Sequence, residues 1–217
     1  MSEHARRPGP APAPRLRRGL YLLTPDEPDS ARMLARVRAV VPHAALLQYR
    51  NKRADRGLQS QQVRMLLPLC RAHGIPLLVN DDWRLAADCG ADGAHLGEDD
   101  GDLREARAAL GASAILGASC YDRLERAEAA VAAGASYVAF GALFPSQTKP
   151  GARRATPELL REAARLGVPR VAIGGITPDN ARIAIDAGAD LVAVIGGVFD
   201  AADPVAAARA YARCFGD

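Results

Sequence analysis

The chain has 217 residues and a mass of 22.9 kDa, which suits one domain of above-average size. With 49% hydrophobic and 24% charged residues it can bury a sizeable core, and its four scattered cysteines indicate neither a disulfide framework nor a zinc site. The net charge of +3 comes largely from the first residues, which argues against a nucleic-acid binder, and no apolar run approaches the ~18 residues of a membrane helix. We expect a disordered basic Pro/Ala-rich tail over residues 1–17 and one folded domain over residues 18–217.

Eight short apolar runs recur along the body of the chain. Most are continuous rather than alternating, as in strands that are covered on both faces of a parallel sheet. They predict strands at residues 19–24, 44–50, 76–80, 94–97, 115–119, 137–142, 170–175 and 191–196. Helical character follows each run, at residues 31–41, 59–73, 83–89, 103–110, 123–133, 157–166, 178–187 and 204–214. Eight β–α units of this length predict a single (β/α)8 TIM barrel, of the α/β class.

The helix-capping and turn residues between these runs agree with the barrel. Asp29, Thr156 and Thr177 are typical residues for helix starts, and glycines fall where helices should end, at Gly74, Gly90, Gly134, Gly167 and Gly188. Three related phrases, CGADGAHLG, AGASYVAFG and AGADLVAVIG, indicate a weak repeat of one unit. The alternative is an open doubly wound sheet, but no G-x-G-x-x-G follows the first strand.

A barrel places its chemistry at the carboxyl ends of its strands, so the polar residues that end each run are candidates for a site. The second run ends Gln48-Tyr49-Arg50-Asn51-Lys52. Alternation along a strand points Gln48, Arg50 and Lys52 the same way, and two converging cations suit an anion such as phosphate. A solvated strand end with ion-pair partners is the alternative interpretation.

Acidic residues follow the next two runs. The third run ends Asn80-Asp81-Asp82, and the fourth leads through His95 to Glu98-Asp99-Asp100. Carboxylates after neighbouring strands suit Mg²⁺, which takes one or two of them together with water and substrate phosphates. Helix capping is the competing explanation, and it is the one we expect for Asp102. For His95 the commoner explanation is a histidine buried in the core.

The remaining runs end in neutral donors. Ser119 ends the fifth run, and a long connection after the sixth holds Ser146-Gln147-Thr148-Lys149. Glycine turns follow the last two strands, at Gly174-Gly175 and Ile195-Gly196-Gly197, where barrels often bind phosphate. The sequence thus predicts two separate anion sites, with a metal at one of them. That arrangement indicates a reaction that joins or rearranges two phosphorylated small molecules.

The motifs LLQYRNK, LLVNDD, ADGAHLGEDD, ILGAS, FPSQTK and AIGGIT match together, in order and spacing, those of a known family. The chain resembles thiamine-phosphate synthase over nearly all of its length after the tail. The resemblance implies a TIM barrel enzyme that joins hydroxymethylpyrimidine diphosphate to hydroxyethylthiazole phosphate, forming thiamine phosphate and pyrophosphate. It also implies Mg²⁺ as cofactor, a cytoplasmic location and no membrane or nucleic-acid partner, and it leaves a homo-oligomer open.

The resemblance also assigns roles by motif position. Arg50, Lys52 and Lys149 would be the catalytic residues that stabilise the leaving group, and Asp81 and Asp100 would hold Mg²⁺. The residues that would bind the pyrimidine diphosphate are Gln48, Tyr49, Arg50, Asn51, Lys52, Asn80, Ser119 and Lys149. Those that would bind the thiazole phosphate are Ser146, Gln147, Thr148, Gly175, Ile195 and Gly196.

Three positions depart from the family pattern. Glu98 stands where Gln is frequent, Gly196 where Ser is common, and Asn51 where an acid is frequent. They affect the expected affinities more than the expected reaction. Two other functions stay open: a thiazole tautomerase on the same fold, with His95 or Cys120 as acid–base group, and a non-catalytic phosphate-ligand sensor.

Overall fold

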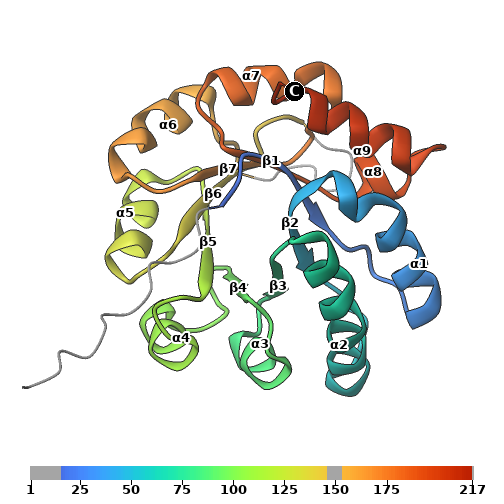
Figure 1. Cartoon of the computed structure of the whole chain (residues 1–217). Helices are drawn as coiled ribbons and strands as arrows, with labels where there is room; N and C mark the ends of the chain where they lie inside the picture. Colours follow the sequence, from blue (N-terminus) through green and yellow to red (C-terminus); the bar gives the residue numbers. More distant parts are fainter. Residues whose placement is uncertain (1–15, 146–152, 217) are drawn as a thin grey trace, which may run out of the picture.

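The computed structural model describes residues 16–145 and 153–216, and within them the eight predicted strands form a closed parallel barrel (Figure 1). The barrel closes where Gly19 pairs with Leu191, joining the first strand to the last. The predicted fold class is therefore confirmed. In chain order the strands are β1 (Gly19–Leu23), β2 (Ala44–Tyr49), β3 (Leu77–Asn80), β4 (Gly93–Leu96), β5 (Ile115–Tyr121), β6 (Tyr137–Gly141), β7 (Arg170–Ile173) and β8 (Leu191–Val194).

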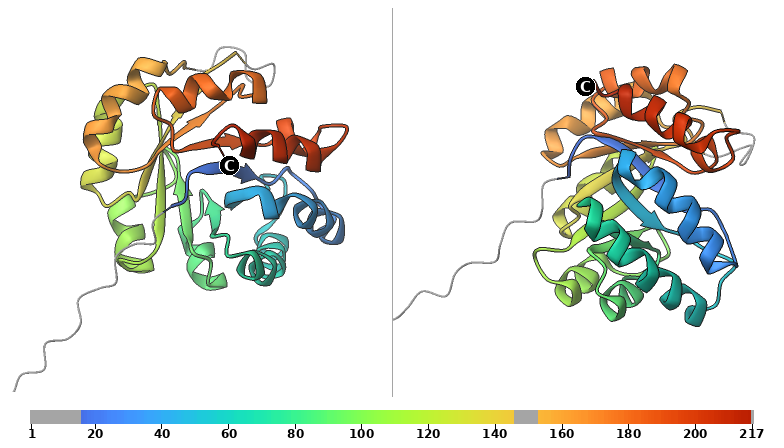
Figure 2. Two further views of the ribbon diagram at one scale, coloured as in Figure 1. Left: turned by 45° about the horizontal axis from the view of Figure 1, so that its top comes forward. Right: turned by 45° about the vertical axis from the view of Figure 1, so that its right-hand side comes forward.

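Helices surround the strands as an outer layer, which the two further views show from other sides (Figure 2). The helices that follow the strands in turn are α1 (Ser30–Val40), α2 (Arg56–His73), α3 (Trp83–Cys89), α4 (Leu103–Leu110), α5 (Leu124–Ala132), α6 (Pro157–Glu162), α7 (Pro178–Asp186) and α9 (Pro204–Arg213). The stretch predicted at 157–166 ends as a 3₁₀ turn, η2 (Ala163–Leu166). Two short helices have no counterpart in the prediction, η1 (Val41–His43) and α8 (Gly196–Phe199). No described helix is long and apolar enough to cross a membrane.

The predicted helix ends are found at the residues that the sequence marks. The Asp29 carboxylate accepts the backbone N–H groups of Ala31 and Arg32, and Thr156 caps α6. Gly74, Gly90 and Gly167 end their helices in the left-handed conformation. The two other predicted glycines, Gly134 and Gly188, come one residue after the helix cap, also with positive φ.

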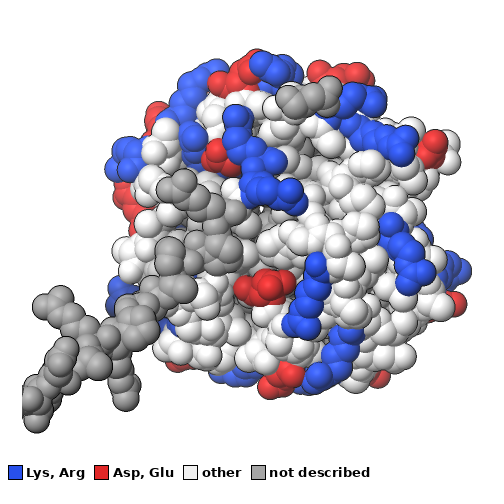
Figure 3. All heavy atoms as spheres, in the orientation of Figure 1, with Lys and Arg blue, Asp and Glu red and all other residues white. Residues whose placement is uncertain are grey.

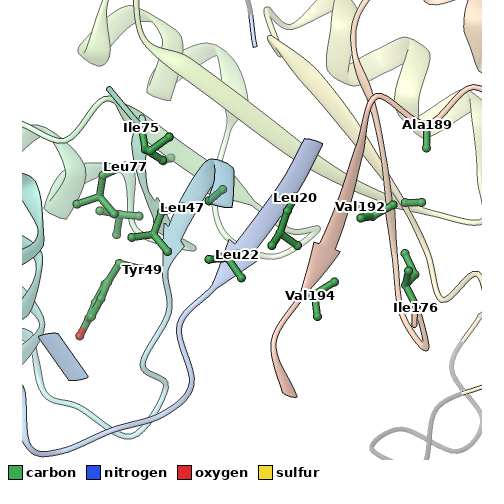
Figure 4. Close-up of a cluster of buried hydrophobic side chains, with 14 of the residues drawn as sticks. Leu20, Leu22, Leu47, Tyr49, Ile75, Leu77, Ile176, Ala189, Val192 and Val194 are labelled. Atoms are coloured by element: carbon green, nitrogen blue, oxygen red, sulfur yellow. The ribbon is translucent and has the colours of Figure 1, made fainter. Parts of the chain in front are cut away.

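Two apolar clusters form the core, because alternate residues of each strand face opposite sides of the barrel wall. The outer cluster lies between strands and helices, and Figure 4 shows Leu20, Leu22, Leu47 and Val192 among its members. The inner cluster fills the barrel, with Leu46, Leu78, Ile115, Val171 and Leu191 among the residues that it contains. The barrel is thus a packed core rather than a pore, and we look for the site at the carboxyl ends of its strands.

Candidate active site at the carboxyl ends of the strands

The two cations predicted after β2 are held at the barrel rim by carboxylates from neighbouring loops. Arg50 Nη1 lies 3.1 Å from Asp26 Oδ1, in the loop after β1, and the same oxygen accepts the Lys52 backbone N–H at 2.8 Å. Lys52 Nζ lies 3.0 Å from Asp81 Oδ2, just after β3. Three successive β–α connections therefore meet at one end of the barrel. Among them lies a pocket of about 350 Å³, whose lining includes Lys52, Asn80 and Asp81.

The backbone of Arg50 is fixed although it lies one residue beyond the strand. Buried Thr24 receives the Arg50 N–H on its hydroxyl oxygen at 2.8 Å and donates its own proton to the Arg50 carbonyl at 2.8 Å. Its backbone N–H also donates to the Gln48 carbonyl at 3.0 Å. The guanidinium of Arg50 therefore extends from a rigid base at the rim.

The two acids predicted as metal ligands lie together. Asp81 has φ +64°, a left-handed conformation that Asp tolerates better than most residues, and its N–H donates to the His95 carbonyl at 2.8 Å. Asp100 accepts the Gly97 N–H at 2.6 Å. Burial and the neighbouring Asp81 carboxyl raise the pKa of Asp100. Two carboxylates that repel each other at a half-open rim match the donor set that Mg²⁺ prefers.

The other acids near this pair have local partners. Asp82 caps α3 by accepting the Leu85 N–H at 2.8 Å, and it also pairs with Arg56. Asp102 caps α4, as predicted. Glu98 lies 3.4 Å from Arg126 and 3.7 Å from Arg153, so arginines offset the extra negative charge that this position brings.

Tyr49 and Asn51 direct their polar atoms away from the barrel interior. The Tyr49 hydroxyl donates to Gln62 Oε1 at 2.8 Å, and Asn51 Nδ2 donates to the Glu27 carbonyl at 2.8 Å. Asn51 thus donates to a carbonyl oxygen, an interaction that an ionised carboxylate in its place could not make. Their predicted contact with the pyrimidine diphosphate stays a prediction, and these hydrogen bonds leave the backbone as the more available part of both residues.

Inside the barrel, below the rim, polar side chains from five strands form one hydrogen-bonded row, which we call the interior chain. Gln48 Nε2 lies 2.5 Å from Tyr21 OH, and Tyr21 OH lies 2.7 Å from Tyr137 OH. Tyr137 OH lies 2.8 Å from His95 Nδ1, and His95 Nε2 lies 2.9 Å from Ser119 Oγ. Burial lowers the pKa of His95 to about 4, so the imidazole is neutral.

The glycine turns after β7 and β8 lie at the same end of the barrel. Gly175 has φ +64°, and a Cβ there would lie 2.5 Å from the Pro145 carbonyl oxygen, so only glycine fits beneath the β6–α6 connection. Asn180 Nδ2 donates to the Gly175 carbonyl at 3.0 Å, and its Oδ1 accepts the Thr177 N–H at 2.8 Å. After β8, Ile195 is the residue before α8, which begins at Gly196.

Four predicted site residues, Ser146, Gln147, Thr148 and Lys149, lie outside the described residues. Four residues of the site region were missed: Thr24, Asp26, Tyr21 and Tyr137. The tyrosines sit inside apolar runs and gave no signal. Asp26 could have been noticed as an acid two residues after the first apolar run, much as Asp81 was noticed after the third.

Charge on the surface is mixed on the face that Figure 3 shows. Basic and acidic side chains both occur around it, with uncharged surface between them (Figure 3).

Comparison with known proteins identifies the family. A family model described as thiamine monophosphate synthase matches residues 20–198. The chain belongs to this family. A thiamine-phosphate synthase from Xanthomonas campestris pv. campestris (strain 8004) is 61% identical over 198 residues, which cover 91% of this chain and 96% of the relative. One from Xylella fastidiosa (strain Temecula1 / ATCC 700964) is 54% identical over 91% of this chain and 85% of the relative.

Solved structures agree with the sequence comparison. A thiamine phosphate pyrophosphorylase from Pyrococcus furiosus superposes with a TM-score of 0.80 at 32% identity, covering 91% of this chain and 95% of that one. An orotidine 5'-phosphate decarboxylase from Pyrococcus horikoshii OT3 shares the fold alone, with a TM-score of 0.66 at 17% identity. The chain is a transferase of thiamine biosynthesis, and the family resemblance in its motifs is confirmed.

Proposed function

We propose that this member of the thiamine monophosphate synthase family joins 4-amino-2-methyl-5-hydroxymethylpyrimidine diphosphate to hydroxyethylthiazole phosphate, with Mg²⁺ as cofactor. The observation that carries the proposal is the meeting of Arg50, Lys52, Asp81 and Asp100 at one end of the barrel. They come from three different β–α connections, which follow the neighbouring parallel strands β2, β3 and β4. Two cations beside two acids suit a diphosphate accompanied by a dication.

The diphosphate is the leaving group in this reaction, so its growing negative charge needs stabilisation. Arg50 offers a planar fork of N–H donors on a fixed backbone, and Lys52 offers a point charge beside Asp81. Preorganised charge of this kind is usually the largest single contribution to catalysis. Lys149 is predicted to add a third cation, from outside the described residues.

Mg²⁺ fits the Asp81 and Asp100 pair for two reasons. The pKa of Asp100 is raised by burial and by the second carboxyl, an energetic strain that a cation would relieve. Ligand number also fits, since Mg²⁺ commonly takes one or two protein carboxylates. When bound, the ion supplies neutralisation of the diphosphate oxygens.

The thiazole phosphate is assigned to the far side of the same rim. The turns at Gly175 and at Ile195–Gly196 offer backbone N–H groups, and Asn180 holds the Gly175 turn in place. Gly196 has no hydroxyl to contribute, so we expect the phosphate to rely on backbone donors there. Ser146, Gln147 and Thr148 are predicted to complete this site.

The reaction that we propose is a dissociative substitution. The bond between the pyrimidine methylene carbon and the diphosphate oxygen breaks first, and its electron pair leaves with pyrophosphate. The thiazole nitrogen then donates its lone pair to the resulting pyrimidine cation, which forms the new carbon–nitrogen bond. No enzyme nucleophile is needed. Cys120 suits none, because burial raises the pKa of its thiol to about 12 and it packs in the outer cluster.

The test is incubation of the protein with both phosphorylated heterocycles, with and without Mg²⁺, followed by oxidation of the product to fluorescent thiochrome. We expect product only when both substrates and Mg²⁺ are present. The proposal fails if no product forms under any condition.

The two alternatives are less well supported. A thiazole tautomerase needs an acid–base group, and neither His95, with a lowered pKa, nor Cys120, with a raised one, is suited to proton exchange near neutral pH. Such an enzyme would also have little use for the residues that we assign to the diphosphate and its metal, which are Arg50, Lys52, Asp81 and Asp100. A sensor would bind the phosphorylated ligands without forming product, which calorimetry beside the same assay would reveal. The cytoplasmic location stays a prediction, and the oligomeric state stays open.

A further inference from the structure

The interior chain joins two residues that are predicted to bind the pyrimidine diphosphate, Gln48 on β2 and Ser119 on β5. Between them lie Tyr21, Tyr137 and His95, which no ligand is predicted to touch. Tyr21 is 1% exposed and Tyr137 is fully buried, so their hydroxyl groups cannot rely on bulk water. A chain of four hydrogen bonds between 2.5 and 2.9 Å is a costly arrangement to leave incomplete in an apolar interior.

The packing of the barrel interior accommodates the side chains of the interior chain. The rings of His95 and Tyr137 are stacked, with centroids 5.6 Å apart, and Tyr21 meets Tyr137 edge-on at 6.0 Å. A Cβ at Gly117 of β5 would lie 2.1 Å from Cζ of Tyr137 and 2.4 Å from Nδ1 of His95. Glycine is therefore the residue that lets this strand run beside the two rings. The chain is built into the wall of the barrel.

With the Gln48 amide oriented so that Nε2 faces Tyr21, the direction of the hydrogen bonds follows from counting protons. Gln48 Nε2 can only donate, so the Tyr21 oxygen accepts and its single proton goes on to Tyr137. Tyr137 in turn donates to His95 Nδ1, and a neutral imidazole then carries its proton on Nε2, where it donates to Ser119 Oγ. With Gln48 donating, the opposite direction would leave the Tyr21 proton buried without an acceptor, at a cost of about 1–3 kcal/mol.

This direction determines what the two ends offer to a ligand. Gln48 Oε1 is buried and has no hydrogen-bond partner among the described residues, so it presents an acceptor. Ser119 has its oxygen occupied by His95 and its own proton left over, so it presents a donor. Reversal of the whole chain would exchange these properties at both ends together. The two ends therefore cannot be set independently.

We propose that Tyr21, Tyr137 and His95 are positioning residues that fix Gln48 as acceptor and Ser119 as donor, and so select a pyrimidine carrying an amino group next to a ring nitrogen. The inference rests on the proposed function, because it concerns the pyrimidine of that reaction. An aminopyrimidine has an N–H donor for Gln48 and a ring-nitrogen acceptor for Ser119. A 4-oxo pyrimidine, with a carbonyl acceptor and a ring N–H donor, has the opposite pattern.

The experiment compares binding of the 4-amino and 4-oxo forms of 2-methyl-5-hydroxymethylpyrimidine monophosphate by calorimetry, since neither carries the diphosphate leaving group. The unaltered protein should bind the amino form more tightly. In Tyr137→Phe, which removes one hydroxyl and keeps the ring, the ratio of the two dissociation constants should fall by roughly three- to tenfold. Tyr21→Phe removes the hydroxyl that lies between Gln48 and Tyr137, and it should lower the same ratio.

Tyr211→Phe is the matched control. Tyr211 is also a buried tyrosine, 1% exposed, whose hydroxyl donates to a single acceptor, the Ile176 carbonyl, at 2.8 Å. It should lose similar thermal stability and leave the binding ratio unchanged. A purely structural role of the interior chain would make all three variants alike.

The outcomes separate the two proposals. If the unaltered protein forms no thiochrome-positive product, the proposed function fails, whatever the binding ratio. If the protein is active but binds both pyrimidines equally, or if Tyr137→Phe and Tyr21→Phe keep its preference, the positioning role is overturned. A lowered ratio in these two variants, with Tyr211→Phe unaffected, supports it.

Discussion

Asp100 accepts the Gly97 N–H at 2.6 Å and lies beside the Asp81 carboxyl. Burial and the neighbouring carboxyl raise the pKa of Asp100, whereas the hydrogen bond from Gly97 lowers it. We predict that Asp100→Asn raises the Mg²⁺ concentration needed for half-maximal activity by at least about tenfold, because the loss of one carboxylate ligand weakens cation binding. The measurement is a Mg²⁺ titration of the initial rate at saturating substrates.

Asp102→Asn provides the control for that titration. Asp102 lies two residues away and caps α4 by accepting the Arg104 N–H, a task that Asn performs nearly as well. Its Mg²⁺ requirement should match that of the unaltered protein. Equal Mg²⁺ curves for both variants would remove Asp100 from the proposed metal site.

The negative charge of Glu98 is paired with nearby arginines. Its carboxylate is shared by Arg126 and Arg153, and both guanidinium groups also lie over the Tyr121 ring. We predict that Glu98→Gln changes the Mg²⁺ requirement by less than about threefold, because exposed ion pairs contribute only about 0–1 kcal/mol. The same titration measures it, and a larger change would mean that Glu98 acts on the metal directly.

At the scale of elements, the β7–α7 turn depends on glycine for two separate reasons. Gly175 has φ +64°, and a side chain there would also meet the Phe144 carbonyl oxygen at 2.7 Å. Gly167, at the end of η2, has a similar φ of +69°, but a Cβ there would have no other atom within 4 Å. Comparing substitutions at Gly167 and Gly175 therefore separates the free-energy cost of a left-handed backbone from the cost of a steric clash.

We predict that Gly167→Ala lowers the free energy of unfolding by about 1–2 kcal/mol, the cost of a left-handed alanine. Gly175→Ala should lose roughly 1–3 kcal/mol more, because the β6–α6 connection must move. It should also raise KM for the thiazole phosphate, whereas Gly167→Ala should not. Urea unfolding and steady-state kinetics measure these effects, and equal losses for both variants would contradict the clash.

The elements were largely predictable from sequence because each signal is local. Continuous apolar runs mark the strands, and Asp29, Thr156 and the glycines mark helix ends through hydrogen bonds within a few residues. The short helix α8 was not predicted, because a Gly-Gly pair is a poor helix former and only the tertiary context holds it.

The site was predictable in part for a related reason. Arg50, Lys52, Asp81 and Asp100 are charged residues that lie at the end of an apolar run or within three residues after it, so the barrel rule brings them together. The interior chain was not predictable, because Tyr21 and Tyr137 fit apolar strands and their partners are 27 or more residues away. Hydrogen bonds between residues so far apart in the sequence depend on the register of the strands around the barrel.

At the scale of the whole molecule, the loop after β1 connects the rim to the helical layer. The backbone carbonyl of Glu27 accepts hydrogen bonds from Asn51 and Gln62, beneath the segment that holds Arg50. Its buried carboxylate receives two hydrogen bonds from Arg32, at 2.6 and 2.7 Å. These bonds lower the pKa of Glu27 below its ordinary value of 4.5, although burial opposes them.

The sign of the resulting pH dependence follows from that shift. A carboxyl with a lowered pKa in the folded state contributes stability above its unfolded value, about pH 4.5, and loses it as pH falls through the lower folded value. We predict that Glu27→Gln reduces the free energy of unfolding at pH 7 by about 1–3 kcal/mol, the usual range for hydrogen bonds to a charged group. The difference from the unaltered protein should shrink below pH 4.5.

Urea unfolding at pH 7 and at pH 3.5 measures this difference, with Glu125→Gln as control. Glu125 is an exposed acid in the first turn of α5, and its replacement should change stability by no more than about 0.5 kcal/mol at pH 7. If the penalty of Glu27→Gln were the same at both pH values, the ionised carboxylate would not be the source of its stability. The lost contribution would then come from packing of the loop against α1, which does not titrate.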